Sequence, residues 1–203
     1  MKNLFKLTAF IILNIFGQCL WANEVLVYKE ERQMIVLNNS GQIIRTYHIS
    51  LGGNPIGHKK RQGDQRTPEG EYILDYKNPS SEFTKSIHIS YPNAKDILEG
   101  RTGNFIMIHG FPTDPVKYKN QRGGGHLTVE ELYEILATSD WTSGCIGLTN
   151  EDMRDFYSSI SIPTKIKIYA NNPNEEKTSN EQNTPEQLPL PIIDEENFNT
   201  NGQ

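Results

Sequence analysis

One cysteine and one histidine are the residues of this chain best suited to nucleophilic chemistry. Cys145 lies in the run Trp-Thr-Ser-Gly-Cys-Ile-Gly-Leu (141–148), directly after Gly144. Glycine permits a tight turn that directs backbone N–H groups outward, and a helix start predicted four residues later favours developing negative charge. His109 ends an apolar run typical of a central strand and is followed by Gly110. Because the thiolate is the reactive form of cysteine, Cys145 needs a base, and His109 is the candidate.

The N-terminal segment predicts that this cysteine has no partner. Residues 1–22 are typical of a signal peptide, with Lys2 and Lys6 before an apolar run that is shorter than the roughly 20 residues of a membrane span. An uncleaved anchor and a lipoprotein signal at Cys19 are the alternatives. Cleavage would leave Cys145 as the one cysteine of a periplasmic protein that is not inserted in the membrane. Such a thiol is either buried and inert or kept for its reactivity.

Several segments together resemble the L,D-transpeptidases with a YkuD-type catalytic domain. The family pattern is a strand ending in His-Gly, then Ser/Thr-x-Gly-Cys with a hydrophobic residue, then Asn. This chain has His-Gly at 109–110, Thr-Ser-Gly-Cys-Ile at 142–146, and Asn150. Thr-Pro-Glu-Gly-Glu-Tyr at 67–72 is similar to the family's strand entry, and the run 86–92 is similar to one branch of the family. The resemblance covers nearly all of the chain between its two ends.

The resemblance implies an enzyme that acts on peptidoglycan stem peptides with no cofactor and no metal. Cys145 would be the nucleophile and His109 the general base and acid, taking the thiol proton during attack or in a preformed thiolate–imidazolium pair. The backbone carbonyl of Gly110 would orient the imidazole, and the N–H groups around Gly144 and Cys145 would stabilise the oxyanion.

The chemistry implied is acylation by the third stem-peptide residue, with release of the terminal D-alanine. Transfer of the resulting thioester to an amine gives a 3→3 cross-link, and transfer to water makes the enzyme an L,D-carboxypeptidase. A third interpretation is a non-catalytic wall-binding module in which Cys145 is buried. The cross-linking transpeptidase is the leading interpretation, and the carboxypeptidase and the wall-binding module are its alternatives. The sequence does not identify the acceptor and carries no signal for the oligomeric state.

The chain departs from the family pattern in two ways. The interval between the histidine and the cysteine is longer than usual, so residues 111–140 are expected to form an enlarged lid or wall. Gly147 stands where the family often has an arginine. Arg122 and Arg66 are the candidate replacements for that arginine, and a solvated surface position is the alternative for each.

Four more residues are candidate substrate contacts: Thr142, Ser143, His88 and Trp141. A structural role for His88 and core packing for Trp141 are equally compatible with the sequence. The five histidines contain no His-x-x-x-His pair, which argues against a zinc site. The basic run 59–61 is expected to be a solvated loop, with attraction to anionic wall polymers as an alternative, and His48 and His58 are expected at the surface.

The elements that position these residues are predicted to be mostly strands. The β-rich runs lie at 25–28, 33–37, 42–51, 71–74, 86–90, 105–108 and 164–169. Capping patterns predict helices over 128–137 and 149–159. We therefore expect a single mostly-β domain, a YkuD-like β-sandwich or mixed sheet with two short helices.

Composition limits the class of protein. The 203 residues carry 20 Lys and Arg against 25 Asp and Glu, a net charge of −5 that argues against a nucleic-acid partner. Residues 173–203 hold seven acids against one lysine and predict a disordered acidic tail. Subtracting this tail (net −6) and the first 22 residues (net +2) from the total of −5 leaves residues 23–172, the expected catalytic domain, at −1.

Overall fold

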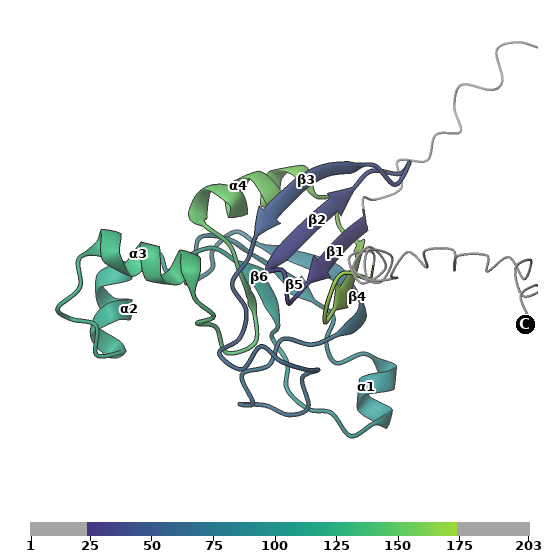
Figure 1. Ribbon diagram of the computed structural model, residues 1–203, viewed down its shortest axis with the longest axis horizontal. Helices are drawn as coiled ribbons and strands as arrows, with labels where there is room; N and C mark the ends of the chain where they lie inside the picture. The colour runs from purple at the N-terminus through teal and green to yellow at the C-terminus, as the bar shows by residue number, and fades with distance from the viewer. Residues whose placement is uncertain (1–23, 174–203) are drawn as a thin grey trace, which may run out of the picture. The chain divides into compact units, whose positions relative to one another are not determined.

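A curled sheet of eight strands makes up the body of the molecule in the computed structural model, which describes residues 24–173 (Figure 1). The predicted signal peptide and all but the first residue of the predicted acidic tail lie outside the described residues. Within residues 24–173, no helix has the length and apolar character that a membrane crossing requires.

The strands are β1 (Glu24–Tyr28), β2 (Gln33–Leu37), β3 (Ile43–His48), β4 (Gly70–Asn78), β5 (Ser86–Ile89), β6 (Met107–His109), β7 (Ile146–Gly147) and β8 (Thr164–Tyr169). Their order in the sheet is β3-β2-β1-β8-β4-β5-β6-β7. β1 pairs with β8 and β6 with β7 in parallel, and the other pairs are antiparallel. Beyond β3, Ser50 pairs with Gly147 of β7, so the two edges of the sheet approach each other.

The mostly-β prediction is confirmed. β2 and β8 have the predicted bounds, and in β8 buried Thr164, Ile166 and Ile168 alternate with more exposed residues. β7 was not predicted, because its two residues are too few to show an alternating pattern.

Within residues 24–173, four helices accompany the sheet: α1 (Ala94–Leu98), α2 (Pro115–Gln121), α3 (Val129–Thr138) and α4 (Asn150–Ser159). α3 and α4 begin at the predicted caps, Thr128 and Thr149, whose hydroxyls accept backbone N–H groups of the first turn. The expectation of two helices was incomplete, because α1 and α2 were not predicted. At five and seven residues they are too short to display a helical apolar pattern, and each depends on an N-cap, Asn93 or Asp114.

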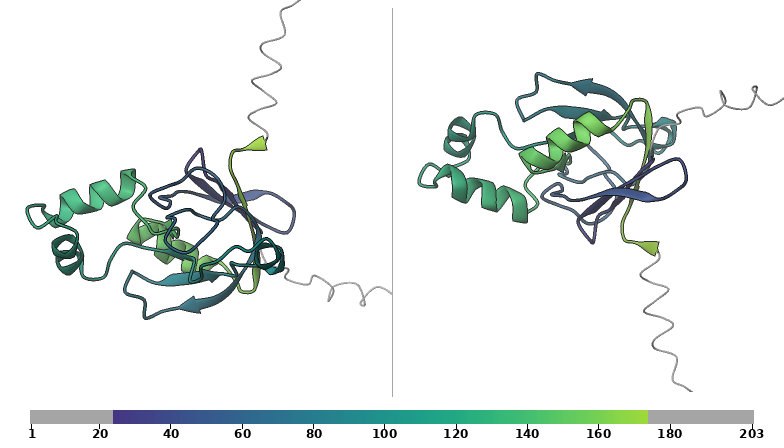
Figure 2. Two further views of the ribbon diagram at one scale, coloured as in Figure 1. Left: turned by 90° about the horizontal axis from the view of Figure 1, so that it is seen from below. Right: turned by 90° about the horizontal axis from the view of Figure 1, so that it is seen from above.

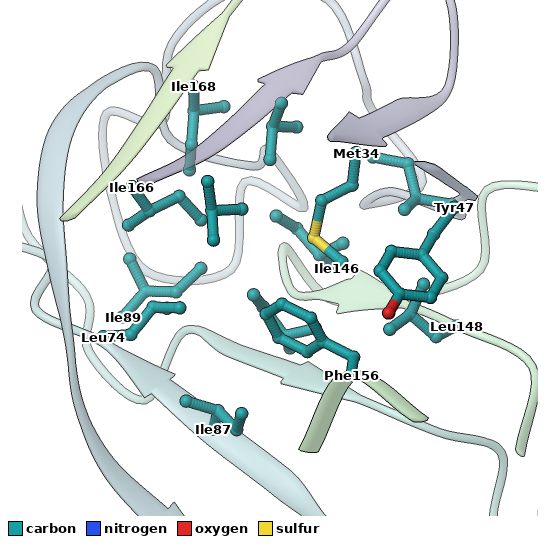
Figure 3. Packing of buried hydrophobic residues seen from close by; sticks show 14 of the residues in the cluster. Met34, Tyr47, Leu74, Ile87, Ile89, Ile146, Leu148, Phe156, Ile166 and Ile168 are labelled. Carbon is teal, nitrogen blue, oxygen red and sulfur yellow. The ribbon is translucent and has the colours of Figure 1, made fainter. Parts of the chain in front are cut away.

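The core lies between the inner face of the sheet and α4. Phe156 of α4 packs against Ile87, Ile89 and Ile146 from β5 and β7 (Figure 3). Side chains alternate along a strand, so the residues between these isoleucines point to the opposite, outer face. Paired residues of that outer face include Ser86, His109 and Gly147 in one row and His88 with Met107 in the next.

α2 and α3 form an insertion that extends away from the sheet (Figure 2). A second, smaller apolar cluster joins this insertion to the outer face. It consists of Phe111, Leu132 and Leu136, with Tyr118, Tyr133, Ala137 and Trp141 packed against them. The segment predicted as an enlarged lid or wall therefore has its own apolar core, beside the row that contains His109.

Candidate active site

The end of β6 holds His109 in one tautomer. The imidazole is only 3% exposed, and its Nδ1 lies 2.8 Å from the backbone carbonyl oxygen of Gly110. A carbonyl oxygen can only accept, so Nδ1 carries the hydrogen and donates it. The lone pair is then on Nε2, which is the nitrogen available as a base.

Two aromatic rings enclose the imidazole. Phe83 stacks on it with ring centroids 4.1 Å apart, and Trp141 meets it edge-on at 5.4 Å. This burial lowers the pKa of His109 to about 4, against the opposing effect of the hydrogen bond to Gly110. The imidazole is therefore neutral near pH 7, as a general base must be. Phe83 had no signal in the sequence, because its ring reaches His109 only through the pairing of β5 with β6.

Backbone groups on both sides of Ile106 face the sulfur of Cys145. The N–H of Met107 points at Sγ from 3.4 Å, and the thiol faces the carbonyl oxygen of Phe105 at 3.7 Å. Burial raises the pKa of the Cys145 thiol, and the Met107 N–H and the charge of Lys59 oppose that rise. Burial thus favours the neutral form of both groups, the thiol and the imidazole.

The pairing of β6 with β7 places Cys145 and His109 near each other in the sheet. His109 pairs with Gly147, two residues after Cys145, and the sulfur contacts the N–H of Met107, two residues before His109. Two residues of a strand span about 7 Å, so sulfur and imidazole occupy neighbouring positions along β6. Cys145 is a half-buried free thiol, not a packed core residue.

Hydrogen bonds to Thr142 shape the turn before the sulfur. Its hydroxyl donates to the carbonyl oxygen of Cys145 at 2.8 Å and accepts the N–H of Gly144 at 3.1 Å. Gly144 has φ +124°, and a Cβ there would lie 2.6 Å from the carbonyl oxygen of Arg66, so only glycine fits.

This turn corrects two predictions. Thr142 is buried and belongs to the turn, so it is not available as a substrate contact. The N–H of Gly144 is already bonded to Thr142, so it does not suit the predicted role of oxyanion donor. For the N–H of Cys145 itself, no acceptor is found within the described part of the chain, which makes it the better candidate donor.

The L,D-transpeptidase catalytic domain family, YkuD, matches residues 22–168 of the chain. The chain belongs to this family. YafK of Escherichia coli (strain K12) is 35% identical over 91 residues, which are 42% of this chain and 37% of YafK.

Two solved structures share the fold. Pgp2 of Campylobacter jejuni, described as a helical cell shape determining protein, aligns with a TM-score of 0.55 and 28% identity over 74% of this chain and 48% of its own. Bd1075 of Bdellovibrio bacteriovorus aligns with a TM-score of 0.51 and 23% identity over 80% of this chain and 54% of its own, and this likeness concerns the fold alone. The chain spans little more than a third of YafK and about half of Pgp2.

Asn150 of the L,D-transpeptidase pattern has a clear structural task. Its side-chain oxygen accepts the N–H of Phe111 at 2.8 Å, and a Cβ on Gly110 would lie 2.8 Å from the same oxygen. The first residue of α4 thereby holds the chain that carries the Gly110 carbonyl.

The place of the family's arginine is taken by an indole ring. A Cβ on Gly147 would lie 3.4 Å from atoms of Trp141 and 3.3 Å from Cβ of Ser50, so a longer side chain would displace the indole. Neither predicted replacement is brought to the sulfur. The Arg122 guanidinium lies over the Tyr118 ring at the end of α2, and the Arg66 guanidinium lies against Gly57.

Lys59 is a buried cation, although the sequence predicted it in a solvated loop. The prediction of a solvated loop is wrong for this residue, which is 2% exposed, with its Nζ 2.8 Å from Asp64 Oδ1. Its charge acts on Cys145, as noted above. Asp64 also accepts backbone N–H groups of the same loop, so its pKa is held well below the usual range. His58, also predicted at the surface, is partly buried and bonded to Asp96 at 3.0 Å.

The remaining candidate contacts differ in their surroundings. Ser143 is exposed in the turn before Cys145, and Trp141 is half-buried in the aromatic cluster. His88 lies on the outer face with its Nδ1 2.7 Å from Asp75 Oδ1 and its ring stacked on Tyr76. Within residues 24–173, no group of three His, Cys, Asp or Glu side chains could hold a metal ion.

Proposed function

We propose that this chain is a peptidoglycan L,D-transpeptidase in which Cys145 is the nucleophile and His109 the general base and acid. One observation carries the proposal: Nδ1 of His109 is bonded to the Gly110 carbonyl, so Nε2 is a neutral base at the position next to a half-buried thiol. An inert cysteine in a wall-binding module would need no neighbouring base that is held in one tautomer.

The proposed reaction proceeds through a thioester. Nε2 of His109 takes the thiol proton as Sγ attacks the carbonyl carbon of the third stem residue, diaminopimelate. The N–H of Cys145 donates to the oxyanion that forms. Collapse breaks the bond to the terminal D-alanine, whose amine leaves with the proton from His109.

The second half of the reaction releases the enzyme. An amine of a neighbouring stem gives its proton to His109 and attacks the thioester, which forms the 3→3 amide. The sulfur leaves and regains the proton from His109. Water in place of the amine gives the tripeptide, so the ratio of the two products depends on how well the site excludes water.

The setting of this reaction is proposed from the substrate and the relatives. Peptidoglycan lies outside the cytoplasmic membrane, and the predicted signal peptide would bring the chain to the periplasm. Pgp2 is named for helical cell shape, and we extend a role in wall organisation and cell shape to this chain.

The test is incubation of the full chain with a disaccharide tetrapeptide, followed by mass analysis. Dimers with free D-alanine identify cross-linking, tripeptide alone identifies an L,D-carboxypeptidase, and unchanged substrate refutes an enzyme. Cys145→Ala should lower either activity below detection, at least about a thousandfold, with an unchanged circular dichroism spectrum. Retained turnover in that variant would exclude thiol catalysis.

A further inference from the structure

Phe105 combines three features that nothing in the folded chain explains together. Its side chain is 67% exposed, its backbone has φ +53°, and its carbonyl oxygen faces the sulfur of Cys145 at 3.7 Å. A bulky side chain in the left-handed region is an outlier that costs free energy. Residues held in such conformations are concentrated at functional sites.

The contacts of the sulfur explain the backbone conformation. The carbonyl of Phe105 and the N–H of Met107 both face Sγ, while Ile106 between them is buried in the core. The chain must therefore bend sharply at position 105 to place these groups around the sulfur. Glycine or asparagine would adopt this bend with less strain. The phenyl ring gains little burial there, so packing within the chain does not offset the strain.

We propose that the Phe105 ring is a specificity-determining contact for the acyl-donor peptide, an inference that rests on the proposed function. The carbonyl oxygen of Phe105 lies 3.7 Å from Sγ, so the backbone that carries the exposed ring is about one residue's length from the substrate carbonyl under attack. The group that it meets is the aliphatic side chain next to that carbonyl. The sugar lies about three residues, or about 10 Å, farther along an extended stem.

The deciding experiment compares two substrates, the disaccharide tetrapeptide and the same tetrapeptide without sugar. Phe105→Ala should raise KM about tenfold for both substrates and leave kcat within about twofold. The reason is that the variant loses the apolar contact between one face of the phenyl ring and the substrate. Ile43→Ala is the matched control, since Ile43 is 61% exposed at the start of β3. Its position seven residues before Ser50, roughly 20 Å along the strand, keeps it away from β7.

Phe105→Gly separates binding from structure. Glycine adopts φ +53° without strain, so this variant should melt no lower than the wild type while showing the same rise in KM. If the ring were needed only for folding, its loss in Phe105→Gly would instead lower the melting temperature and leave KM unchanged.

Two results would overturn the inference while the proposed function stands. If Phe105→Ala has the KM of the wild type, the ring does not contact the substrate. If KM rises only for the disaccharide substrate, the ring contacts the sugar and not the peptide. If the wild type turns over neither substrate, the proposed function fails. Binding of the tetrapeptide to Cys145→Ala, with and without Phe105→Ala, then decides the contact separately: about tenfold weaker binding supports it, and equal binding overturns it.

Discussion

The proposed base and the proposed nucleophile of this site are held in opposite ways. His109 is enclosed by the rings of Phe83 and Trp141 and buried to 3% exposure. Cys145 is half-buried, and its sulfur is surrounded mainly by backbone groups of Phe105 and Met107. Side-chain packing therefore sets the pKa of His109, whereas backbone geometry sets the position of the Cys145 sulfur.

The difference predicts where the site is sensitive to substitution. On the imidazole side, replacing an aromatic residue by an aliphatic one should admit water to His109 and so change the pKa of the imidazole. On the sulfur side the sensitive positions should be those that hold the turn, because backbone groups cannot be removed by substitution. The α2–α3 insertion belongs to the imidazole side, since its aromatic residues pack against Trp141.

The largest effect is expected when the base itself is removed. His109→Ala should lower kcat by about a hundred- to ten-thousandfold, because the thiol then loses its proton acceptor. In the wild type the neutral imidazole is the active form, so kcat/KM should fall only as pH drops through about 4. Product analysis across pH 3–8 measures both the loss of kcat in the variant and the pH dependence of the wild type. If His109→Ala changes the melting temperature but keeps full turnover, His109 has a structural role only.

The enclosure of the base can be opened by Phe83→Leu. Water reaching the imidazole should raise the pKa of His109 toward its ordinary value of about 6.5, which moves the acid limb of the pH–rate profile upward. We expect roughly tenfold lower turnover at pH 5 and little change at pH 8. Phe156→Leu is the matched control, since Phe156 is buried on the opposite face of the sheet. It should lower stability and leave the acid limb in place, and equal shifts in both variants would contradict the enclosure.

The turn on the sulfur side can be loosened by Thr142→Val. This removes the hydrogen bonds to the Cys145 carbonyl and from the Gly144 N–H. The Gly144 N–H is then left unpaired, and the Cys145 carbonyl keeps only the longer 3.4 Å hydrogen bond from the Thr67 hydroxyl. This loss should cost about 1–3 kcal/mol of unfolding free energy in urea titration. Thr142→Ser should restore most of it, and no recovery with serine would show that the methyl group matters more than the hydroxyl.

The smallest effect is expected at Ser143, the exposed neighbour of the turn. Ser143→Ala should change the unfolding free energy by less than about 0.5 kcal/mol. If the hydroxyl binds substrate, KM rises by about two- to tenfold, as for one lost hydrogen bond. An unchanged KM would leave Ser143 outside the binding site.

Local patterns were enough for much of the fold. β8 was predicted from strict alternation, and α3 and α4 from Thr caps whose hydroxyls do bond the first helical turn. Strand alternation and helix capping both depend on residues close together in the sequence, so they can be recognised without knowledge of the tertiary structure. β7 and α1 were missed because stretches of two and five residues carry no period and depend on long-range pairing or a single cap.

The same limit applies to the site. Cys145 and His109 could be selected as candidates from residue type and flanking glycines. Phe83, Lys59 and the bonded N–H of Gly144 could not, because each depends on contacts between segments or on the exact path of a turn. A lysine in a basic run is ordinarily solvated, and only the position of Asp64 reveals that this one is buried and paired.

The amino-acid sequence by itself determined which groups can react and which family of folds the chain adopts, since both depend on residue type and short-range order. The tertiary structure alone decided the protonation states of those groups. Charge in a protein depends on what excludes water and what donates hydrogen bonds, and here these partners come from strands and loops distant along the chain.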